Sequence, residues 1–397
     1  MTEKHIQADV VIVGAGIAGL WLHNRLNQLG YHALLLEKGK IGQAQTLSAQ
    51  GIIHGGSKYA LNGILSNAAQ AISAMPTRWQ ACLSGQGEID LSQVKINTNH
   101  QLLWSTNSLS SKMVSFFASK ALQSRMQAVP KSARQGLFAD PSFQGSLYEL
   151  DEPVLDVHSV LTQLTQTYPE RILQLPDGEM YCDFEKVRLQ SIHYGDVQIS
   201  AQQFVFTAGE GMADILSALG LKKPKMQLRP LQMLLCKAKN PETPLPKIYA
   251  HSLGSGSKPI ATISSHSDKD GNIVWYLGGN IAEEGVGKPT NVLIKEAQAL
   301  LSQILPWYSP PELIWATHNV NRAEPKQSGF ARPDSAFVSS HENVHIGWPT
   351  KLALAPDLSD KVIAALETQN LQKNAPQNTD ALPRAEIAEP LWDRAFQ

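Results

Sequence analysis

Cysteine is scarce in this chain of 397 residues. The three cysteines, Cys82, Cys182 and Cys236, are far apart, and no Cys-x-x-Cys pair occurs. This usage argues against a disulfide framework and against a zinc site, and it fits a reducing compartment. We therefore expect the protein to be cytoplasmic.

Long apolar runs and a charge imbalance are also missing. No segment has 18 uninterrupted apolar residues, so the sequence predicts no membrane span. The formal net charge is −1, which provides no overall field to attract nucleic acid or an anionic membrane. The apolar run at 8–22 is not interpreted as a signal peptide, because its glycines have a specific explanation and no cleavage site follows.

The chain does contain a glycine motif between a predicted strand and a predicted helix. The run 9–13 is apolar and rich in β-branched residues, which is typical of a buried parallel strand. Gly14-Ala-Gly16-Ile-Ala-Gly19 follows at once, and leucines then recur at helical spacing over 20–29. A second buried strand is predicted at 33–37. Together these segments predict one βαβ unit.

Each residue of this motif suits a dinucleotide. Gly14 permits the tight turn, Gly16 lets the backbone approach a pyrophosphate, and Gly19 allows close packing of helix on strand. Glu37, followed by Lys38, ends the second strand, where a carboxylate accepts hydrogen bonds from ribose hydroxyls and would repel the 2′-phosphate of NADP. A glycine cluster at a helix start with no ligand is the alternative.

The glycine motif by itself does not separate FAD from NAD. Two features favour FAD. The motif lies at the extreme N-terminus, and a second strand with a small-residue turn, Phe204–Gly209, appears about 190 residues later. That arrangement is typical of flavoproteins that close the FAD domain after a long insertion.

The remaining pattern interleaves two kinds of segment. We predict an α/β, Rossmann-type FAD-binding domain with a discontinuous second, β-rich (α+β) substrate domain. The FAD-binding domain takes 1–80, 150–225 and 310–370, the substrate domain takes 81–149 and 226–309, and 371–397 form a loose C-terminal tail. Helices are predicted at 67–82, 156–166, 291–305 and 358–366, and a hairpin turn at 269–272.

Several blocks of the sequence resemble those of one known protein superfamily. They are Gly14–Gly19 with Glu37, then Thr46–Tyr59, Val187, Thr207–Gly209, Asn321–Ala323 and Gly347–Leu352. In these blocks the chain resembles the D-amino-acid-oxidase superfamily of FAD proteins. It is most similar there to the glycerol-3-phosphate dehydrogenase and L-2-hydroxyglutarate dehydrogenase branches.

The resemblance implies roles around FAD. Thr46 and Ser48 would contact the pyrophosphate region, and the segment from Gly51 to Gly56 would pass the isoalloxazine. Val187 would meet the adenine with its backbone. The remaining cofactor contacts implied are Gly209, Gly347, Thr350 and Leu352, with Lys351 near the flavin pyrimidine. Some relatives attach FAD through a histidine near the position of Ser48, and serine cannot form that bond, so FAD is expected to be non-covalent.

Four residues are candidates for substrate chemistry, and each has a structural alternative. His54 is a proton acceptor or a scaffold histidine in a glycine-rich loop. Lys58 binds an anion or is a solvated lysine. Arg322 falls where relatives hold a substrate arginine, and its planar fork suits a carboxylate or phosphate, but it could equally form a salt bridge. Lys351 supports the flavin or is structural.

We therefore expect an FAD-dependent dehydrogenase or oxidase. Its substrate is a small anion, such as a 2-hydroxy acid or a glycerol-3-phosphate-like molecule, that passes a hydride to flavin N5. The electron acceptor is left open between oxygen, a quinone and a protein. The alternatives are an amine or amino-acid oxidase of the same fold, and a flavin-binding redox or modification module without turnover.

Overall fold

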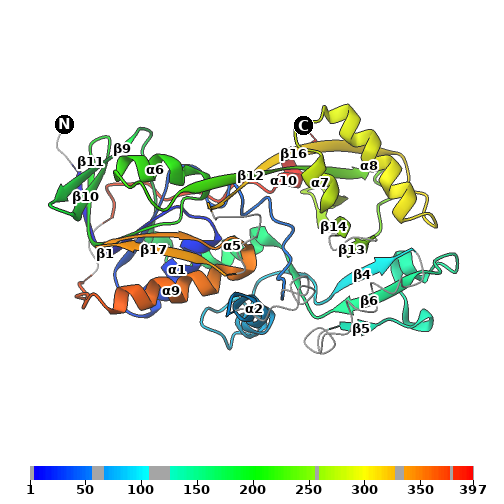
Figure 1. The fold of residues 1–397 in the computed structure, drawn as a ribbon, viewed down its shortest axis with the longest axis horizontal. Helices are drawn as coiled ribbons and strands as arrows, with labels where there is room; N and C mark the ends of the chain where they lie inside the picture. Colours follow the sequence, from blue (N-terminus) through cyan, green and yellow to red (C-terminus); the bar gives the residue numbers. More distant parts are fainter. Residues whose placement is uncertain are drawn as a thin grey trace.

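The computed structural model describes residues 4–55, 67–106, 126–254, 259–326, 335–375 and 379–396. Two eight-stranded sheets lie toward opposite ends of an elongated molecule (Figure 1). A two-stranded sheet pairs β3 (Ile96–Thr98) with β7 (Val154–Leu155). This architecture confirms the predicted fold class.

The first sheet is built around the N-terminal strand. Its order is β17-β18-β11-β1-β2-β8, with β10 also paired to β11 and β9 to β10. The neighbours from β18 to β8 run parallel, and residues 8–13 of β1 are buried, as expected for a strand covered on both faces. The strands are β1 (Lys4–Val13), β2 (Ala33–Glu37), β8 (Ile172–Gln174), β9 (Met180–Glu185), β10 (Arg188–Tyr194), β11 (Val197–Phe206), β17 (Phe337–His341) and β18 (Val344–Trp348).

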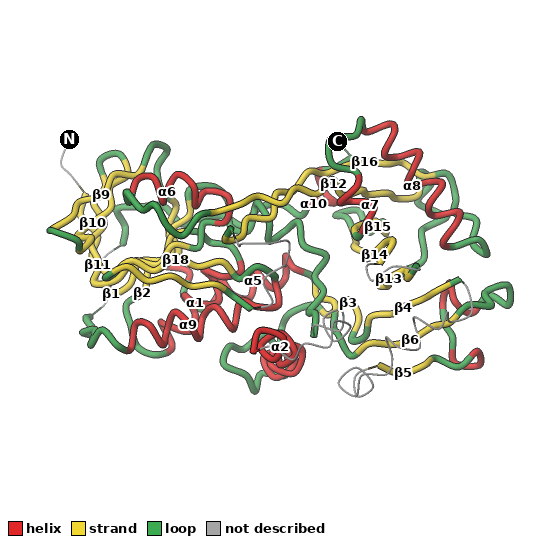
Figure 2. The backbone as a smooth tube through the Cα atoms, viewed as in Figure 1, coloured by secondary structure: helices red, strands yellow, loops and turns green. Residues whose placement is uncertain are grey.

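Helices cover the two faces of this sheet unequally. One face packs against α1 (Ile17–Gln28), α2 (Asn67–Leu83), α5 (Val157–Gln166) and α9 (Ala355–Glu367). The other face packs against α6 (Met212–Ala218) and the hairpin of β9 and β10. Figure 2 shows α1 and α9 together on one side and α6 on the other. The carboxyl ends of β1 and β11 meet where α1 begins.

The second sheet is mostly antiparallel, in the order β16-β12-β15-β14-β13-β4-β6-β5. Two helices, α7 (Asn280–Glu284) and α8 (Thr290–Ile304), contribute to its apolar core. The strands are β4 (Gln101–Ser105), β5 (Met126–Ala128), β6 (Ser146–Leu150), β12 (Met226–Ala238), β13 (Tyr249–Leu253), β14 (Pro259–Ser267), β15 (Ile273–Gly278) and β16 (Leu313–Pro325).

The two longest strands of this sheet link it to the first. β12 and β16 pair along their whole lengths, from Met226 opposite Pro325 to Ala238 opposite Leu313. In Figure 1 this ribbon runs from the second sheet back toward β1. β16 therefore belongs to the second sheet, although 310–370 was assigned to the FAD-binding domain. The cause is long-range pairing, which the local pattern of residues 313–325 does not encode.

The C-terminal segment differs from its prediction as a loose tail. Bridges join Ile41 to Ile387 and Leu173 to Arg384. The short helix α10 (Leu391–Arg394) buries Leu391 and Trp392, each 3% exposed, against the second sheet. Burial of these two large apolar side chains holds the end of an otherwise polar segment against the second sheet.

Among the described helices, none is both long enough and apolar enough to cross a membrane. In the same residues, His, Cys, Asp and Glu side chains form no group of three or more that could hold a metal ion.

Candidate active site

A cavity of about 1560 Å³ lies between the first sheet and the β12–β16 ribbon. It exceeds the roughly 300–1,000 Å³ of pockets for drug-sized ligands, and therefore has room for a dinucleotide and a second small molecule. Its lining includes the glycine motif, Glu37 and residues 178–183, together with His54, Arg322 and residues 347–352.

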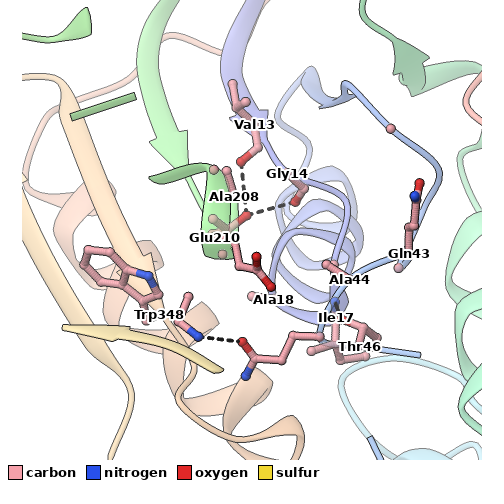
Figure 3. A pocket seen from close by; sticks show the side chains of 18 of the residues that line it. Val13, Gly14, Ile17, Ala18, Gln43, Ala44, Thr46, Ala208, Glu210 and Trp348 are labelled. Carbon is pink, nitrogen blue, oxygen red and sulfur yellow. Dashed lines mark hydrogen bonds between the residues drawn. The ribbon is translucent and has the colours of Figure 1, made fainter. Parts of the chain in front are cut away.

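The glycine motif forms a close backbone junction at one wall. Gly14 has φ +107°, and a Cβ there would lie 2.7 Å from the Cα of Ala208. A Cβ on Gly19 would lie 2.1 Å from the carbonyl oxygen of Gly14. The start of α1 can therefore pack this closely against the end of β1 only with glycine at position 19. Gly16 is different, because its Cβ would meet only the Thr46 Oγ1, at 3.1 Å. Gly16 presents bare backbone to the cavity. Figure 3 shows Gly14 beside Ala208, with Thr46 across the start of α1.

Polar groups at the start of α1 are arranged for a phosphate and a ribose. The Thr46 Oγ1 accepts the Ile17 N–H at 3.1 Å. The Glu37 carboxylate accepts the Ala15 N–H at 2.7 Å and the Gly39 N–H at 2.8 Å, which fixes it at the cavity wall. A helix N-terminus with its amides toward a cavity is a natural anion site.

Elsewhere in the cavity lining, His54 forms a dyad with a buried acid. Its Nδ1 lies 3.1 Å from the Oε2 of Glu152, a residue only 3% exposed. The other oxygen of Glu152 accepts the Gly55 N–H at 2.8 Å. The ring of His251 stacks on His54 with centroids 5.8 Å apart. These contacts fix the imidazole at the cavity wall.

Arg322 projects from β16 into the same cavity. Its guanidinium lies 3.9 Å from the carboxylate of Glu283 on α7. The nearby acid Glu324 is instead bound by Arg229 and by Gln227, the latter at 2.8 Å. These two partners of Glu324 are residues of β12, whereas Arg322 pairs with Glu283.

The loop after β18 forms another part of the lining. Thr350 has φ +63°, an uncommon conformation for a β-branched residue and a sign of local strain. Trp348, Lys351 and Leu352 line the cavity with it. A Cβ on Gly347 would lie 3.0 Å from Leu358 of α9. Strained backbone held by surrounding structure is typical of ligand sites.

Ser48 is another residue of the cavity lining. Its hydroxyl donates to the carbonyl oxygen of Ala44 at 2.9 Å and lies 2.9 Å from the Nε2 of His318. The Tyr276 hydroxyl donates to the Ser48 carbonyl at 3.0 Å. Burial, followed by the positive charge of Arg394, lowers the pKa of His318. His318 is therefore held neutral against the serine.

The family follows from comparison with known proteins. The model of the DAO family, FAD dependent oxidoreductase, matches residues 9–353. The chain belongs to the DAO family of FAD-dependent oxidoreductases. It is an enzyme and its cofactor is FAD, so the non-catalytic flavin module is set aside.

Relatives of known structure support this assignment. The probable FAD-dependent oxidoreductase PA4991 of Pseudomonas aeruginosa is 42% identical over 393 residues, covering 98% of this chain and 99% of its own. Its crystal structure aligns with a TM-score of 0.87 and 37% identity over 100% of both chains.

More distant structures share the fold alone. Iminodiacetate oxidase of Chelativorans sp. BNC1 has a TM-score of 0.65 and 14% identity, with 96% of this chain and 100% of that one covered. FAD-bound L-α-glycerophosphate oxidase of Mycoplasma pneumoniae has a TM-score of 0.62 and 13% identity, with 94% and 97% covered.

The structure brings most of the predicted site residues to one cavity. Those that line it are Gly14, Gly16, Glu37, Lys38, Thr46, Ser48, His54, Gly209, Arg322, Gly347, Thr350, Lys351 and Leu352. Gly19 and Gly51 lie behind the wall, where a Cβ on Gly51 would be 2.1 Å from the carbonyl oxygen of Leu155. Lys58 lies outside the described residues.

The contact of the Val187 backbone with the adenine stays a prediction. Val187 is 68% exposed at the turn between β9 and β10, away from the cavity. Residues 178–183, before that turn, line the cavity instead. The reason is the hairpin itself, which brings β9 alongside the cavity and carries its own turn outward.

Glu152, Glu324 and Arg394 are among the charged residues near the site that were missed from the sequence. Glu152 supports His54, Glu324 lines the wall beside Arg322, and Arg394 reaches the cavity from α10. A signal for Glu324 was present, since it follows Arg322 by two residues and so shares its face of a strand. Glu152 and Arg394 carried no local signal, because distant pairing decides their place.

Proposed function

We propose that this enzyme oxidises a small anionic 2-hydroxy acid or a glycerol-3-phosphate-like alcohol. The observation that carries the proposal is the His54–Glu152 dyad in the same cavity as Arg322. Oxidation of an alcohol removes a hydride from carbon and a proton from oxygen, so it needs a base beside the hydroxyl group. We also propose that, within the family, the chain is most similar to the glycerol-3-phosphate dehydrogenase and L-2-hydroxyglutarate dehydrogenase branches.

The dyad determines which nitrogen of His54 serves as the base. A carboxylate at Nδ1 favours the tautomer with the proton on Nδ1, and Nε2 is then the acceptor. Glu152 also stabilises the imidazolium that forms when Nε2 takes the hydroxyl proton. Its second oxygen is engaged by the Gly55 N–H, so the carboxylate keeps its orientation.

Other residues of the cavity lining fit FAD. Gly16 offers bare backbone for the pyrophosphate, Thr46 holds the start of α1, and Glu37 would accept the ribose hydroxyls. Bound FAD supplies the acceptor for the substrate hydride. Lys351 and the Thr350 loop are proposed to lie at its pyrimidine end.

FAD is proposed to be non-covalent because Ser48 offers no imidazole or thiol for attachment. Acid precipitation of the yellow protein should leave the flavin in the supernatant. Colour that stays with the pellet would contradict this and would direct attention to His318, which contacts Ser48.

Arg322 is proposed to bind the anionic group of the substrate. A guanidinium in a partly buried pocket makes charge-assisted hydrogen bonds of about 1.5–3 kcal/mol each. Arg322→Met should therefore lower kcat/KM about 10- to 150-fold while FAD content is unchanged. Arg322→Lys should recover only part of the loss, because an ammonium lacks the planar fork. Unfolding of the Met variant would instead favour a structural salt bridge with Glu283.

An amine or amino-acid substrate is the second candidate. Glu324 lines the cavity near Arg322, and a carboxylate there could meet a substrate ammonium. Iminodiacetate oxidase, which has the same fold, is named for a substrate that carries both an amine and carboxylates.

One experiment separates the two candidates. The FAD-loaded protein is mixed without oxygen with 2-hydroxy acids, glycerol phosphates and amino acids, and bleaching of the flavin is followed. Hydroxy acids or glycerol phosphates should bleach it, and His54→Asn should slow bleaching about 10²- to 10⁴-fold. His100→Asn, at an exposed histidine outside the cavity lining, is the control. Bleaching by amino acids alone would overturn the proposal.

A further inference from the structure

The C-terminal segment 379–396 runs from the first sheet to the second, and residues of both sheets line the cavity. Near its start, the Gln174 N–H donates to the carbonyl of Pro383 at 2.8 Å, and the Ile41 N–H donates to that of Glu386 at 2.7 Å. These contacts fasten it to the first sheet and to the loop that precedes Thr46. It then crosses to the second sheet and ends in α10, beside the β12–β16 ribbon (Figure 1).

Three contacts hold α10 in place. Trp392 stacks on the buried ring of His266, with centroids 3.9 Å apart and planes at 13°. The Lys269 N–H donates to the carboxylate of Asp393 at 2.7 Å. The ammonium of Lys237 lies 4.9 Å from the ring centroid of Phe396. Residues on both sides of position 394 are therefore fixed, and so is the point from which its side chain starts.

Arg394 projects from this fixed point into the cavity. It lines the same space as Arg322, and its charge contributes to the lowered pKa of His318, second to burial. Within the described part of the chain, Arg394 makes no ion pair with a carboxylate. The family match ends at residue 353, so this arginine comes from outside the matched region.

Arg394 and Arg322 lie along one wall. Leu391 and Trp392 pack in one cluster with Met233 and Val320, which also line the cavity. His318 and Arg322 are four residues apart on β16, which corresponds to about 13 Å along a strand. The lining of this one cavity therefore includes two arginines that reach it from different elements, Arg322 from β16 and Arg394 from α10.

We propose that Arg394 binds a second anionic group of the substrate, a carboxylate or a phosphate, at the opposite end from the group held by Arg322. The inference rests on the proposed function, in which Arg322 holds the first group. The substrate class is then a dianion with its charges at the two ends of a short chain. An exposed arginine that forms no ion pair with a carboxylate among the described residues is suited to this role, because none of those residues has to release it when the ligand arrives.

The test measures ligand binding to the FAD-loaded protein, by perturbation of the flavin spectrum. Glutarate and 3-phosphonopropionate carry two anionic groups, and pentanoate carries one on a chain of similar length. Arg394→Met should weaken glutarate or 3-phosphonopropionate about fivefold and leave pentanoate unchanged. The ligand that loses more identifies the second group as carboxylate or phosphate. Lys295→Met, on the exposed side of α8, makes the same charge change away from the cavity and should alter nothing.

The outcomes separate this inference from the proposed function. Arg322→Met should weaken all three ligands. If it does so while Arg394→Met has no effect, or weakens pentanoate equally, the inference is wrong and the proposed anion site stands. If Arg322→Met changes nothing, the proposed anion site fails. A wild-type protein that binds both dianions no better than pentanoate also overturns the role of Arg394.

Discussion

Two glycines of the N-terminal motif should respond in opposite ways to the same small substitution. Gly14 has a positive φ and touches the backbone of Ala208, whereas Gly16 has φ −78° and ψ −177°, which any residue adopts. Gly14→Ala should therefore damage the fold, and Gly16→Ala should damage cofactor binding. Neither result depends on knowing the substrate.

The magnitudes follow from the contacts. At Gly14 the new Cβ would lie 2.7–2.8 Å from three backbone atoms, which cannot move aside. Backbone strain of about 1–3 kcal/mol and overpacking of about 1–3 kcal/mol add to roughly 4 kcal/mol. At Gly16 the nearest atom is a side-chain oxygen at 3.1 Å, so the apoprotein should lose less than about 1 kcal/mol. Loss of one charge-assisted bond to the pyrophosphate would weaken FAD about 10- to 150-fold.

Thermal unfolding of the apoprotein and titration with FAD measure the two effects separately. Gly14→Ala should lower the Tm of the apoprotein by roughly 5 °C. Gly16→Ala should leave that Tm nearly unchanged and raise the Kd for FAD at least tenfold. The reasoning is refuted if Gly16→Ala binds FAD as the wild type does, or if both variants destabilise the apoprotein equally.

Three further outcomes are expected. Trp392→Ala should lower the free energy of unfolding by about 3–5 kcal/mol in urea titrations, because the side chain is buried against His266, whereas a freely moving tail would show no change. Glu152→Gln should slow anaerobic flavin bleaching by hydroxy acids about 10²-fold with FAD retained, since an amide cannot stabilise the His54 imidazolium; unchanged bleaching would remove the dyad from the mechanism. Burial lowers the pKa of both His23 and His266 to about 3, so the unfolded chain binds these protons first as pH falls below 6.5. Stability should then decline below pH 6.5 by about 1.4 kcal/mol per pH unit for each histidine, and urea midpoints that stay level from pH 7 to 5 would contradict this.

The first βαβ unit was predictable because its signals are local. The apolar run before Gly14, the glycine spacing and the acid at Glu37 lie within about thirty residues, and β2 has the predicted bounds of 33–37. Glycine is required there by backbone contacts that every such unit shares. The helix at 291–305 was similarly visible from its periodicity and is observed as α8.

The features that escaped prediction depend on distant pairing. His54 and Glu152 are 98 positions apart, and no local pattern links them. The composition of the tail predicts a loose segment. In the structure, Leu391 and Trp392 hold it in place by packing against apolar residues of the second sheet. β16 has the appearance of an ordinary strand, and its partner β12 begins almost ninety residues earlier.

The order of strands in the first sheet has a consequence for how the protein acquires its flavin. β1 is the first strand to be synthesised. Thr207, whose hydroxyl donates to the carbonyl oxygen of Gly14, is synthesised 193 residues later. At about 5–20 residues per second, a ribosome needs roughly 10–40 s to bridge that interval. During this time one edge of an apolar strand has no partner, and such edges are prone to aggregation. We expect the glycine loop to hold FAD only after β11 has emerged and paired with β1, in the second half of synthesis or later. Chaperone protection of the first fifty residues should therefore raise the yield of yellow protein, and slower translation should lower it.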